Sequence, residues 1–347
     1  MAKFERVTLD PAEWGRTLST FPDANVFQSP AWLAFLAETQ DAEPVLAALK
    51  EGNETLGYFT GLIIKKFGLK ILGSPFRGWT TPYMGFNLRP EVPRQLAAGA
   101  MKHFAFRELG CIHFEVVDLP MRTDMISGLD LIHEPRTTLE VDLTQSEDAL
   151  FGNLTKSCRW TVRKAEKNGV IVEEAKDLAF ADDYTNQLKD VFDKQGMVPF
   201  HGVDRVRALI KHMLPTGAIL MLRARNSEGE CIATGVYPAL NQIAFYWGGA
   251  SWREHQKLYP NELMQWSAMK YWKQRGMKVY NLVGAMEFKQ KFGGHPVPLI
   301  MVGKSKYRLI SQLRSSLPRA AKAAVRAAWK VKAAVKGNGA PVDTKDS

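Results

Sequence analysis

The sequence predicts an α/β (α+β) protein of two halves, each with a mixed, mostly antiparallel sheet flanked by helices. Three observations support this. The chain has 347 residues, which is long for one domain and sufficient for two hydrophobic cores. Apolar patterns of helical and strand period alternate along it. No apolar run approaches the roughly 18–20 residues that cross a bilayer, and lysines break the most apolar stretch, residues 61–73.

The first half begins with a helix and continues with strands. Residues 27–38 carry apolar side chains at helical spacing behind Ser29 and Pro30, which fit an N-cap and a first-turn proline. Residues 44–66 resemble two strands around a polar turn, and residues 94–109 resemble a helix. This half is therefore expected to contain its own sheet with helices packed on it.

A boundary is predicted near Pro135. It separates a first domain of residues 1–135 from a second of residues 136–308, followed by a basic tail of residues 309–347. Thr144, with Glu147 three residues later, fits a capping box that opens a helix. The expected elements of the second half are a strand at 137–143, helices within 147–168, 178–194, 203–213 and 260–276, strands at 170–174, 279–283 and 299–307, and three strands within 217–249.

Charge is concentrated at the C-terminal end. The net charge is +10, and the residues from Lys304 onward contribute +9 of it. The body is therefore nearly neutral, and the high pI of the chain does not predict a DNA-binding protein. The first ten residues contain no apolar segment of a secretory signal, so a cytoplasmic location is expected.

Cysteine and histidine patterns predict no metal centre. The three cysteines are far apart, and the seven histidines show no ligand spacing with them or with one another. A catalytic cysteine–histidine pair stays a minor alternative, because such residues can meet in space without being close in sequence.

The first motif is a basic helix that ends at Gly169. Lys156, Arg159, Arg163 and Lys167 recur every three or four residues and form one stripe. Such a stripe could bind phosphates of a tRNA backbone or of a diphosphate. The alternative is a solvated helix face, which is the more common origin of a charge stripe.

The second and third motifs lie near the C-terminal end of the second half. Residues 243–251 run from apolar and aromatic residues into Gly248 and Gly249, where glycine permits close approach of the backbone. Further on, Lys289 and Lys291 lie between Phe288 and Phe292 in EFKQKFGG. A fixed ammonium can stabilise the oxyanion that forms when an amine attacks a carbonyl. The alternatives are a core strand with a tight turn and a surface turn with solvated lysines.

The order of these motifs resembles the FemAB-like branch of the GNAT N-acyltransferase superfamily. That branch has a pattern like Arg-x-x-x-Arg-Lys-Ala-x-x-x-Gly, found here at residues 159–169. A Tyr-x-Gly-Ala-Ser-like turn follows, matched at 247–251, then a helix with an aromatic face, and then a Phe-Lys-x-x-Phe-Gly closure, matched at 288–293. The similarity covers residues 137–302 well and is thinner over the first half.

The resemblance implies two tandem GNAT-like domains and a set of site residues. It implies that a central strand splays from its neighbour to hold the acyl donor, and that Lys289 lies beside the reacting carbonyl. The residues it implies are Phe288 and Lys289 for catalysis; Lys156, Arg159, Arg163, Lys164, Trp247, Gly248, Gly249, Ser251 and Lys291 for the donor; and Phe76, Arg77, Trp79 and Tyr83 for the acceptor.

The resemblance also implies a substrate class. The best-known relatives move amino acids from aminoacyl-tRNA onto peptidoglycan precursors, and others are linked to exopolysaccharide assembly. The expected co-substrate is therefore aminoacyl-tRNA or an acyl-CoA, with no tightly bound cofactor. The Gln/Arg-x-x-Gly-x-Gly/Ala loop that holds the CoA diphosphate is absent, which disfavours CoA. Relatives often have Asp where this chain has Asn281, which puts a role for that acid in doubt.

The tail adds a candidate interaction segment. Residues 318–336 are rich in alanine and lysine, and a basic helix is expected there, with Trp329 largely opposite its charged face. Such a helix would bind an anionic membrane surface. Contact with a tRNA backbone and a solvated tail stay open as alternatives.

The sequence therefore predicts a cytoplasmic acyl- or aminoacyltransferase, peripheral at the inner membrane face, that acts on an amine of a peptidoglycan, exopolysaccharide or other envelope precursor. One alternative is a CoA-dependent acetyltransferase of a small amine or amino sugar. Another is a non-catalytic scaffold on membrane or RNA. The acyl group, the acceptor, the general base and the oligomeric state stay open.

Overall fold

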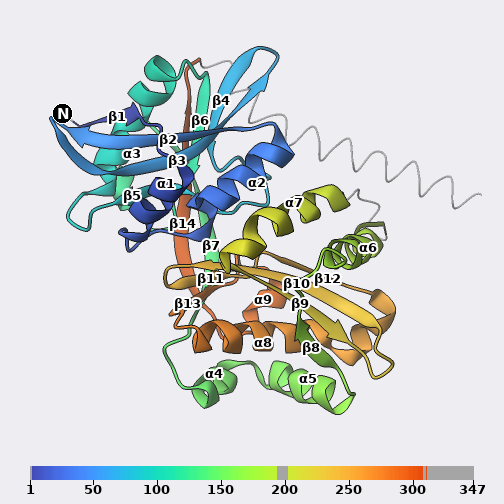
Figure 1. The fold of residues 1–347 in the computed structure, drawn as a ribbon. Helices are drawn as coiled ribbons and strands as arrows, with labels where there is room; N and C mark the ends of the chain where they lie inside the picture. Colours follow the sequence, from blue (N-terminus) through green and yellow to red (C-terminus); the bar gives the residue numbers. More distant parts are fainter. Residues whose placement is uncertain (1, 194–201, 308–309, 311–347) are drawn as a thin grey trace, which may run out of the picture. The chain divides into compact units, whose positions relative to one another are not determined.

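One mixed β-sheet runs through the described chain, and helices flank it (Figure 1). The computed structural model describes residues 2–193, 202–307 and 310. Fourteen strands form the sheet, in the order β1-β2-β3-β4-β6-β14-β7-β13-β11-β10-β9-β8, with β5 paired to β3 and β12 paired to β10. Most pairings are antiparallel, whereas β4–β6 and β11–β13 are parallel. The predicted α/β fold with mostly antiparallel pairing is confirmed.

The first half contains the predicted helices and strands in the predicted order, preceded by β1 and α1, which were not predicted. Its elements are β1 (Lys3–Arg6), α1 (Pro11–Ser19), α2 (Pro30–Gln40), β2 (Glu43–Glu51), β3 (Glu54–Lys66), β4 (Leu69–Ser74), β5 (Gly85–Leu88), α3 (Arg94–His103) and β6 (His113–Val117).

The second half contains the remaining elements. They are β7 (Ile132–Asp142), α4 (Glu147–Asn153), α5 (Lys156–Lys167), β8 (Ile171–Glu174), α6 (Phe180–Asp193), α7 (Val203–Met213), β9 (Ile219–Arg225), β10 (Cys231–Leu240), β11 (Ile243–Phe245), β12 (Gly248–Ser251), α8 (Pro260–Gln274), β13 (Val279–Asn281), α9 (Glu287–Gln290) and β14 (His295–Ser305).

Helix starts illustrate where local sequence decides structure. Ser29 caps α2 by accepting a hydrogen bond from the Trp32 backbone N–H, as predicted. The predicted capping box of α4 is wrong. The helix does begin at Glu147, but Ser146 is its N-cap. Thr144 instead donates from its backbone N–H and its hydroxyl to the Asp142 carboxylate.

Strands β7 and β14 join the two halves of the sheet. They pair antiparallel over nine positions, from His295–Glu140 to Gly303–Ile132. Pro135, the predicted boundary, lies inside β7 opposite Ile300. The division into domains near Pro135 stays a prediction.

Three apolar clusters pack on the sheet, two of them contain residues of both halves, and the larger of these two includes Phe27 and Phe245. In that cluster the Phe27 and Phe245 ring centroids are 4.7 Å apart, and those of Trp32 and Trp247 are 5.9 Å apart. Helix α2 of the first half packs against α7 of the second. The strand region that carries the second sequence motif is therefore buried against the first half.

A buried ion pair stabilises the first half, and it supports a testable prediction. Asp118 accepts from Arg94 Nη1 at 2.6 Å and from the Phe86 backbone N–H at 3.0 Å. Burial raises the pKa of Asp118 to about 6, so the carboxylate is charged at neutral pH. Asp118→Ala should lower the free energy of unfolding by about 1–3 kcal/mol, because Arg94 and the Phe86 N–H lose a buried acceptor while Arg94 keeps its ion pair with Asp23.

Urea unfolding of matched variants tests this prediction. The control is Glu134→Ala, which removes the partner of the half-exposed Arg77 and should cost less than about 1 kcal/mol. Equal losses in the two variants would contradict the structural role given to Asp118.

The chain divides into two units, Met1–Lys304 and Ser305–Ser347. The basic helix predicted at residues 318–336 lies outside the described residues. Among the residues that are described, no helix is both long enough and apolar enough to cross a bilayer.

Candidate acyl-transfer site

The strands around β11 separate at one point. β11 pairs in parallel with β13 from Ile243–Val279 to Phe245–Asn281. The Tyr246 backbone N–H still donates to the Asn281 carbonyl at 2.9 Å. Beyond that link β12 pairs only with β10, and no other strand of the described chain pairs with its second edge. The second edge of residues 248–251 thus has no described partner strand beyond the point where the pairing of β11 with β13 ends.

Glycine is required in β12 because tyrosines crowd it. A Cβ atom at Gly248 would lie 2.7 Å from the Tyr184 hydroxyl oxygen, and one at Gly249 would lie 3.0 Å from the Tyr246 hydroxyl oxygen. The end of β12 is fixed by Ser251, whose Oγ accepts from Asn261 Nδ2 at 3.0 Å. The strand therefore presents bare backbone beside the hydroxyls of the buried Tyr184 and the partly buried Tyr246.

Lys289 on α9 is a buried amine. Its side chain is 6% exposed, and its Nζ donates to the Val283 carbonyl at 2.6 Å and lies 5.2 Å from the centroid of the Tyr246 ring. No carboxylate of the described residues forms an ion pair with it. Burial lowers the pKa of Lys289 to about 8. Two of its three N–H bonds are left to act on a substrate oxygen.

The acceptor of the Lys289 hydrogen bond sits in a strained turn. Val283 has φ 54°, a left-handed conformation that is unfavourable for a β-branched residue. Asn281 Oδ1 accepts from the Val283 backbone N–H at 2.8 Å and from Thr138 Oγ1 at 2.9 Å. Asn281 Nδ2 donates to Glu140 Oε1 at 3.0 Å. Asn281 therefore uses both ends of its amide to hold the turn that positions Lys289.

Lys291, the second lysine of the motif at residues 288–293, is neutralised by an ion pair. Lys291 Nζ lies 2.5 Å from Glu262 Oε1 and 4.1 Å from the Phe288 ring centroid. The Lys291 carbonyl also accepts from the Thr155 backbone N–H at 3.0 Å. Lys291 and Phe288 thus connect α9 to α8 and to the start of α5.

The basic stripe lies on α5. Arg159 donates to the carbonyls of Gly152 and Leu154 and is used within the α4–α5 connection. Lys156 and Arg163 are exposed and Lys164 is half-buried. None of these four cations forms an ion pair with an acid in the described part of the chain. Three of them are therefore available to an anionic ligand.

The predicted acceptor residues divide into two groups. Tyr83 is buried, and its hydroxyl donates to Asn281 Oδ1 at 3.4 Å. Burial raises the pKa of Tyr83 to about 12. The Phe76 and Trp79 rings pack at an angle of 53°, with centroids 4.8 Å apart. Arg77, by contrast, is exposed and paired with Glu134. The structure brings Tyr83 to the Lys289 turn, whereas Arg77 faces β7.

Sequence reasoning missed Arg205 on α7. Its Nη2 donates to Thr80 Oγ1 at 2.9 Å, and the Gln40 side-chain oxygen also accepts from it. The guanidinium lies 5.5 Å from the Phe35 ring centroid and has no acidic partner among the described residues. Burial lowers the pKa of Arg205 to about 10, and Tyr184 is close enough to influence it. Nothing in the sequence distinguishes Arg205 from its exposed neighbours.

Thr138 and Glu140 were also missed, although a signal existed. They are two residues apart on β7, so they share one face of a strand, and that face meets Asn281. The described residues contain no cluster of three or more histidine, cysteine or acidic side chains that could hold a metal ion.

The N-terminus of α8 departs from a diphosphate site. Such a site uses free backbone N–H groups at a helix start. Here Pro260 occupies the first turn and lacks an N–H, Tyr259 before it has φ 60°, and Glu262 brings a negative charge into the first turn. The geometry disfavours a CoA diphosphate at this position.

Comparisons with known proteins agree with this architecture. Residues 152–290 match the family model of the acetyltransferase (GNAT) domain. The crystal structure of FemX superposes with a TM-score of 0.73 at 15% identity, covering 89% of this chain and 99% of that one. A tandem GNAT protein from the clavulanic acid biosynthesis pathway gives a TM-score of 0.55 at 8% identity, covering 88% and 99% of the two chains.

A third structure superposes over most of this chain. It is the C-terminal domain of a putative lysylphosphatidylglycerol synthetase from Agrobacterium fabrum, with a TM-score of 0.53 at 13% identity and coverage of 88% and 95%. No curated protein sequence matches the chain at a significant level. Residues 152–290 therefore match a GNAT acetyltransferase domain, which is the domain type of an acyltransferase, and the chain shares the fold of FemX.

Proposed function

We propose that this protein transfers an aminoacyl or acyl group to an amine of a cell-envelope, peptidoglycan or exopolysaccharide precursor. The observation that carries the proposal is Lys289, a buried ammonium without a carboxylate partner in the described chain, whose Nζ lies 5.2 Å from the ring centroid of Tyr246, the residue whose hydroxyl crowds Gly249 of β12. The shared fold of FemX and of the lysylphosphatidylglycerol synthetase domain supports aminoacyl transfer in particular.

The proposed reaction has no covalent enzyme intermediate. The donor arm lies along residues 248–251 with its carbonyl oxygen toward Lys289 Nζ. The neutral acceptor amine attacks the carbonyl carbon, and negative charge develops on the oxygen, where the ammonium stabilises it. The C–O or C–S bond to the donor then breaks, and the leaving group takes the electron pair. The amine nitrogen loses a proton, which passes to the leaving oxygen or, when the leaving group is a thiolate, to water, and the amide is formed.

Donor phosphates are assigned to α5. Lys156, Arg163 and Lys164 have no acidic partner among the described residues, which supports contact with a tRNA backbone. Arg159 shapes the same end of the helix through its bonds to Gly152 and Leu154. We place the protein in the cytoplasm at the inner membrane face, with residues 318–336 as a candidate anchor.

The acceptor is assigned to the side of Tyr83 and Trp79. Arg205 lies next to this side through Thr80 and has only neutral partners in the described chain. A half-buried guanidinium with neutral partners is favourable once an anion joins it. The proposed acceptor therefore carries a carboxylate or phosphate in addition to its amine.

Arg205→Met should raise KM for the acceptor by about 10–100-fold and leave KM for the donor unchanged, since one charge-assisted contact is lost. Steady-state kinetics with each substrate varied in turn measure this. The matched control is Arg207→Met, on the same helix but exposed and paired with Asp182. A rise in the donor KM instead would move Arg205 to the donor side.

The deciding experiment supplies labelled amino acids on a bulk charged tRNA pool to a bacterial lipid and cell-wall precursor extract. Label that enters the extract only with this protein, and not with its Lys289→Met variant, supports aminoacyl transfer. A parallel reaction with labelled acetyl-CoA tests the other donor. Transfer from acetyl-CoA alone would replace the aminoacyl proposal, and transfer from neither donor would reject it.

A further inference from the structure

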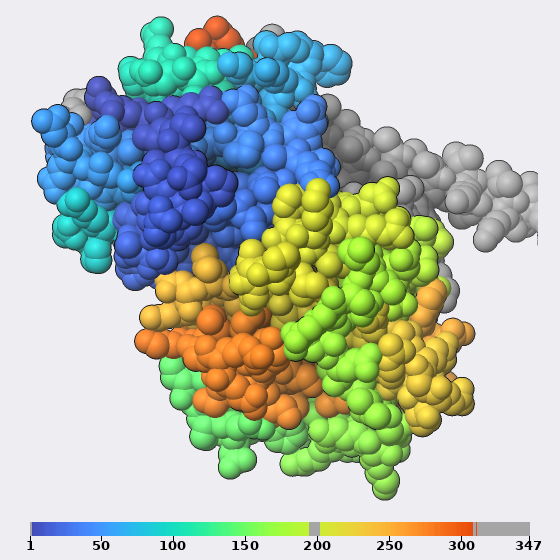
Figure 2. Space-filling view, viewed as in Figure 1, coloured from blue at the N-terminus to red at the C-terminus, as the bar shows by residue number. Residues whose placement is uncertain are grey.

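The hairpin between β3 and β4 exposes apolar residues at its tip. Lys66 and Leu69 are the last paired residues, and Phe67 and Gly68 form a two-residue turn with φ 52° and 76°. Phe67 is fully exposed, at 102%, and Leu69 is 48% exposed. Figures 1 and 2 show this light-blue hairpin at the edge of the first half.

Phe67 makes the hairpin tip energetically unfavourable in water, and no contact in the described structure compensates for this cost. Left-handed positions in such turns favour asparagine and glycine, and Gly68 satisfies this preference. Phe67 does not, because a bulky aromatic residue in this conformation is strained. Its ring gains no burial in exchange, since it is fully exposed. Strain combined with an unburied aromatic ring indicates a role outside the free molecule.

Positive charge surrounds the apolar tip. Lys65, Lys66 and Lys70 fall within six residues that contain no acid. Lys65 and Lys70 are directly opposite each other in the hairpin, which is a repulsive arrangement. An anionic surface would relieve this repulsion.

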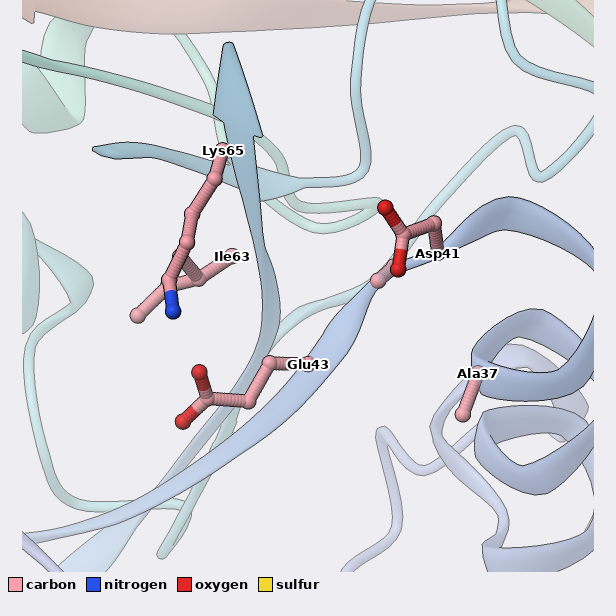
Figure 3. Close-up of a pocket in the computed structure, with 6 residues that line it drawn as sticks. Ala37, Asp41, Glu43, Ile63 and Lys65 are labelled. Carbon is pink, nitrogen blue, oxygen red and sulfur yellow. The ribbon is translucent and has the colours of Figure 1, made fainter. Parts of the chain in front are cut away.

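Glu43 is close enough to interact electrostatically with both Lys65 and Lys70. Figure 3 shows the Lys65 side chain extending toward Glu43 in a pocket of about 250 Å³, and Asp41 also lines this pocket. Glu43 is shared with Arg6, whose Nη2 is 2.7 Å from it. Lys66 and Lys70 form no ion pair with an acid in the described chain.

We propose that this hairpin tip docks onto an anionic lipid bilayer. Phe67 and Leu69 enter the boundary between headgroups and acyl chains, and Lys66 and Lys70 contact lipid phosphates. A protruding turn with an aromatic apex suits insertion into a deformable surface. The lysines supply attraction to anionic lipid. The proposal rests on the hairpin alone and is independent of the transfer reaction.

Nucleic acid is the competing anionic partner, and the shape of the tip disfavours it. Stacking of bases uses aromatic rings on a platform inside a basic groove. Phe67 instead occupies the apex of a two-residue turn, with no neighbouring aromatic ring within stacking distance in the described residues.

The test uses the full chain in co-sedimentation with phosphatidylcholine vesicles, with and without phosphatidylglycerol. The wild type should bind only the anionic vesicles, more weakly as salt rises. Phe67→Asn keeps a turn that asparagine and glycine favour but removes the ring, and it should weaken binding about tenfold. The double variant Lys66→Gln and Lys70→Gln should weaken binding and reduce its dependence on salt.

Matched controls make each outcome decisive. Ile171→Thr removes a 64% exposed apolar side chain from β8 and should leave binding unchanged. Urea unfolding should show that Phe67→Asn is at least as stable as the wild type. The proposal is overturned if the wild type does not bind anionic vesicles, or if Phe67→Asn binds them equally well. It is also overturned if the hairpin variants lose binding to bulk tRNA while vesicle binding persists.

Discussion

Replacing Lys289 with methionine is expected to lower kcat/KM for transfer by about 10²–10³-fold, which is typical when a single oxyanion donor is removed. Methionine has similar length and polarisability to the lysine stem, so the cavity stays filled. The Val283 carbonyl loses its donor, and the substrate oxyanion loses the ammonium. Single-turnover rates with donor and acceptor both saturating measure the chemical step.

The same variant should be more stable than the wild type. Burial lowers the pKa of Lys289 to about 8, below the usual 10.5, so the folded state binds this proton less tightly than the unfolded state. The resulting destabilisation is fully present below pH 8 and disappears as pH rises toward 10.5. Lys289→Met should therefore raise the free energy of unfolding at pH 7 by about 1–3 kcal/mol.

Lys291→Met is the matched control and should change stability in the opposite direction. Its partner Glu262 has a side chain that is only 12% exposed. Removing the lysine leaves that carboxylate unpaired, with an expected loss of about 2–4 kcal/mol. If Lys289→Met were less stable than the wild type, Lys289 would be a structural residue and the proposed transfer mechanism would lose its main support.

The rate of the wild type should respond to pH in the same range. As pH rises through about 8, Lys289 loses its proton and can no longer stabilise an oxyanion, so kcat should fall. Deprotonation of the acceptor amine acts in the opposite direction at lower pH, which predicts a bell-shaped profile. A profile that rises without a fall up to pH 10 would show that the charge on Lys289 is not used.

Much of the fold follows from local sequence, whereas the joining of its halves does not. Ser29 and Pro30 specify the start of α2 because a cap and a first-turn proline act within one helical turn. Pro135 suggests a break, yet it lies inside β7. At Pro135, β7 pairs with β14 on one side and with no strand of the described chain on the other, because β13 pairs only with residues 140–142. Proline lacks a backbone N–H, and on the side without a partner strand this loss interrupts no hydrogen bonding between strands.

The candidate site divides in the same way. Lys289 and the glycines of β12 belong to short motifs that sequence order can identify. The partners that position Lys289 cannot be identified so, because Asn281 and Glu140 are 141 residues apart and meet only through the pairing of β13 with β7. Arg205 is identified as a candidate because no acidic side chain of the described residues pairs with it. Only the folded structure shows this absence.

Asn281→Asp is expected to reduce kcat about 10–100-fold and to lower the free energy of unfolding by about 2–4 kcal/mol. The new carboxylate keeps the acceptor that holds Val283 N–H and Thr138 Oγ1. It replaces the amide that donates to Glu140 with a second negative charge, 3.0 Å from Oε1. Repulsion would open the strained turn and move the Val283 carbonyl away from Lys289 Nζ. Stability should recover as pH falls, because two close carboxylates share one proton.

A second substitution separates repulsion from simple loss of packing. Adding Glu140→Gln to Asn281→Asp restores an amide–carboxylate pair with donor and acceptor exchanged, so activity and stability should both return to within a few-fold of the wild type. Glu140→Gln alone should have a small effect, because an amide oxygen can still accept from Asn281 Nδ2. If the double variant regained its unfolding midpoint but not its activity, the Asn281 amide would have a role beyond holding the turn. Full activity of Asn281→Asp alone would show that the Val283 turn does not determine the position of Lys289.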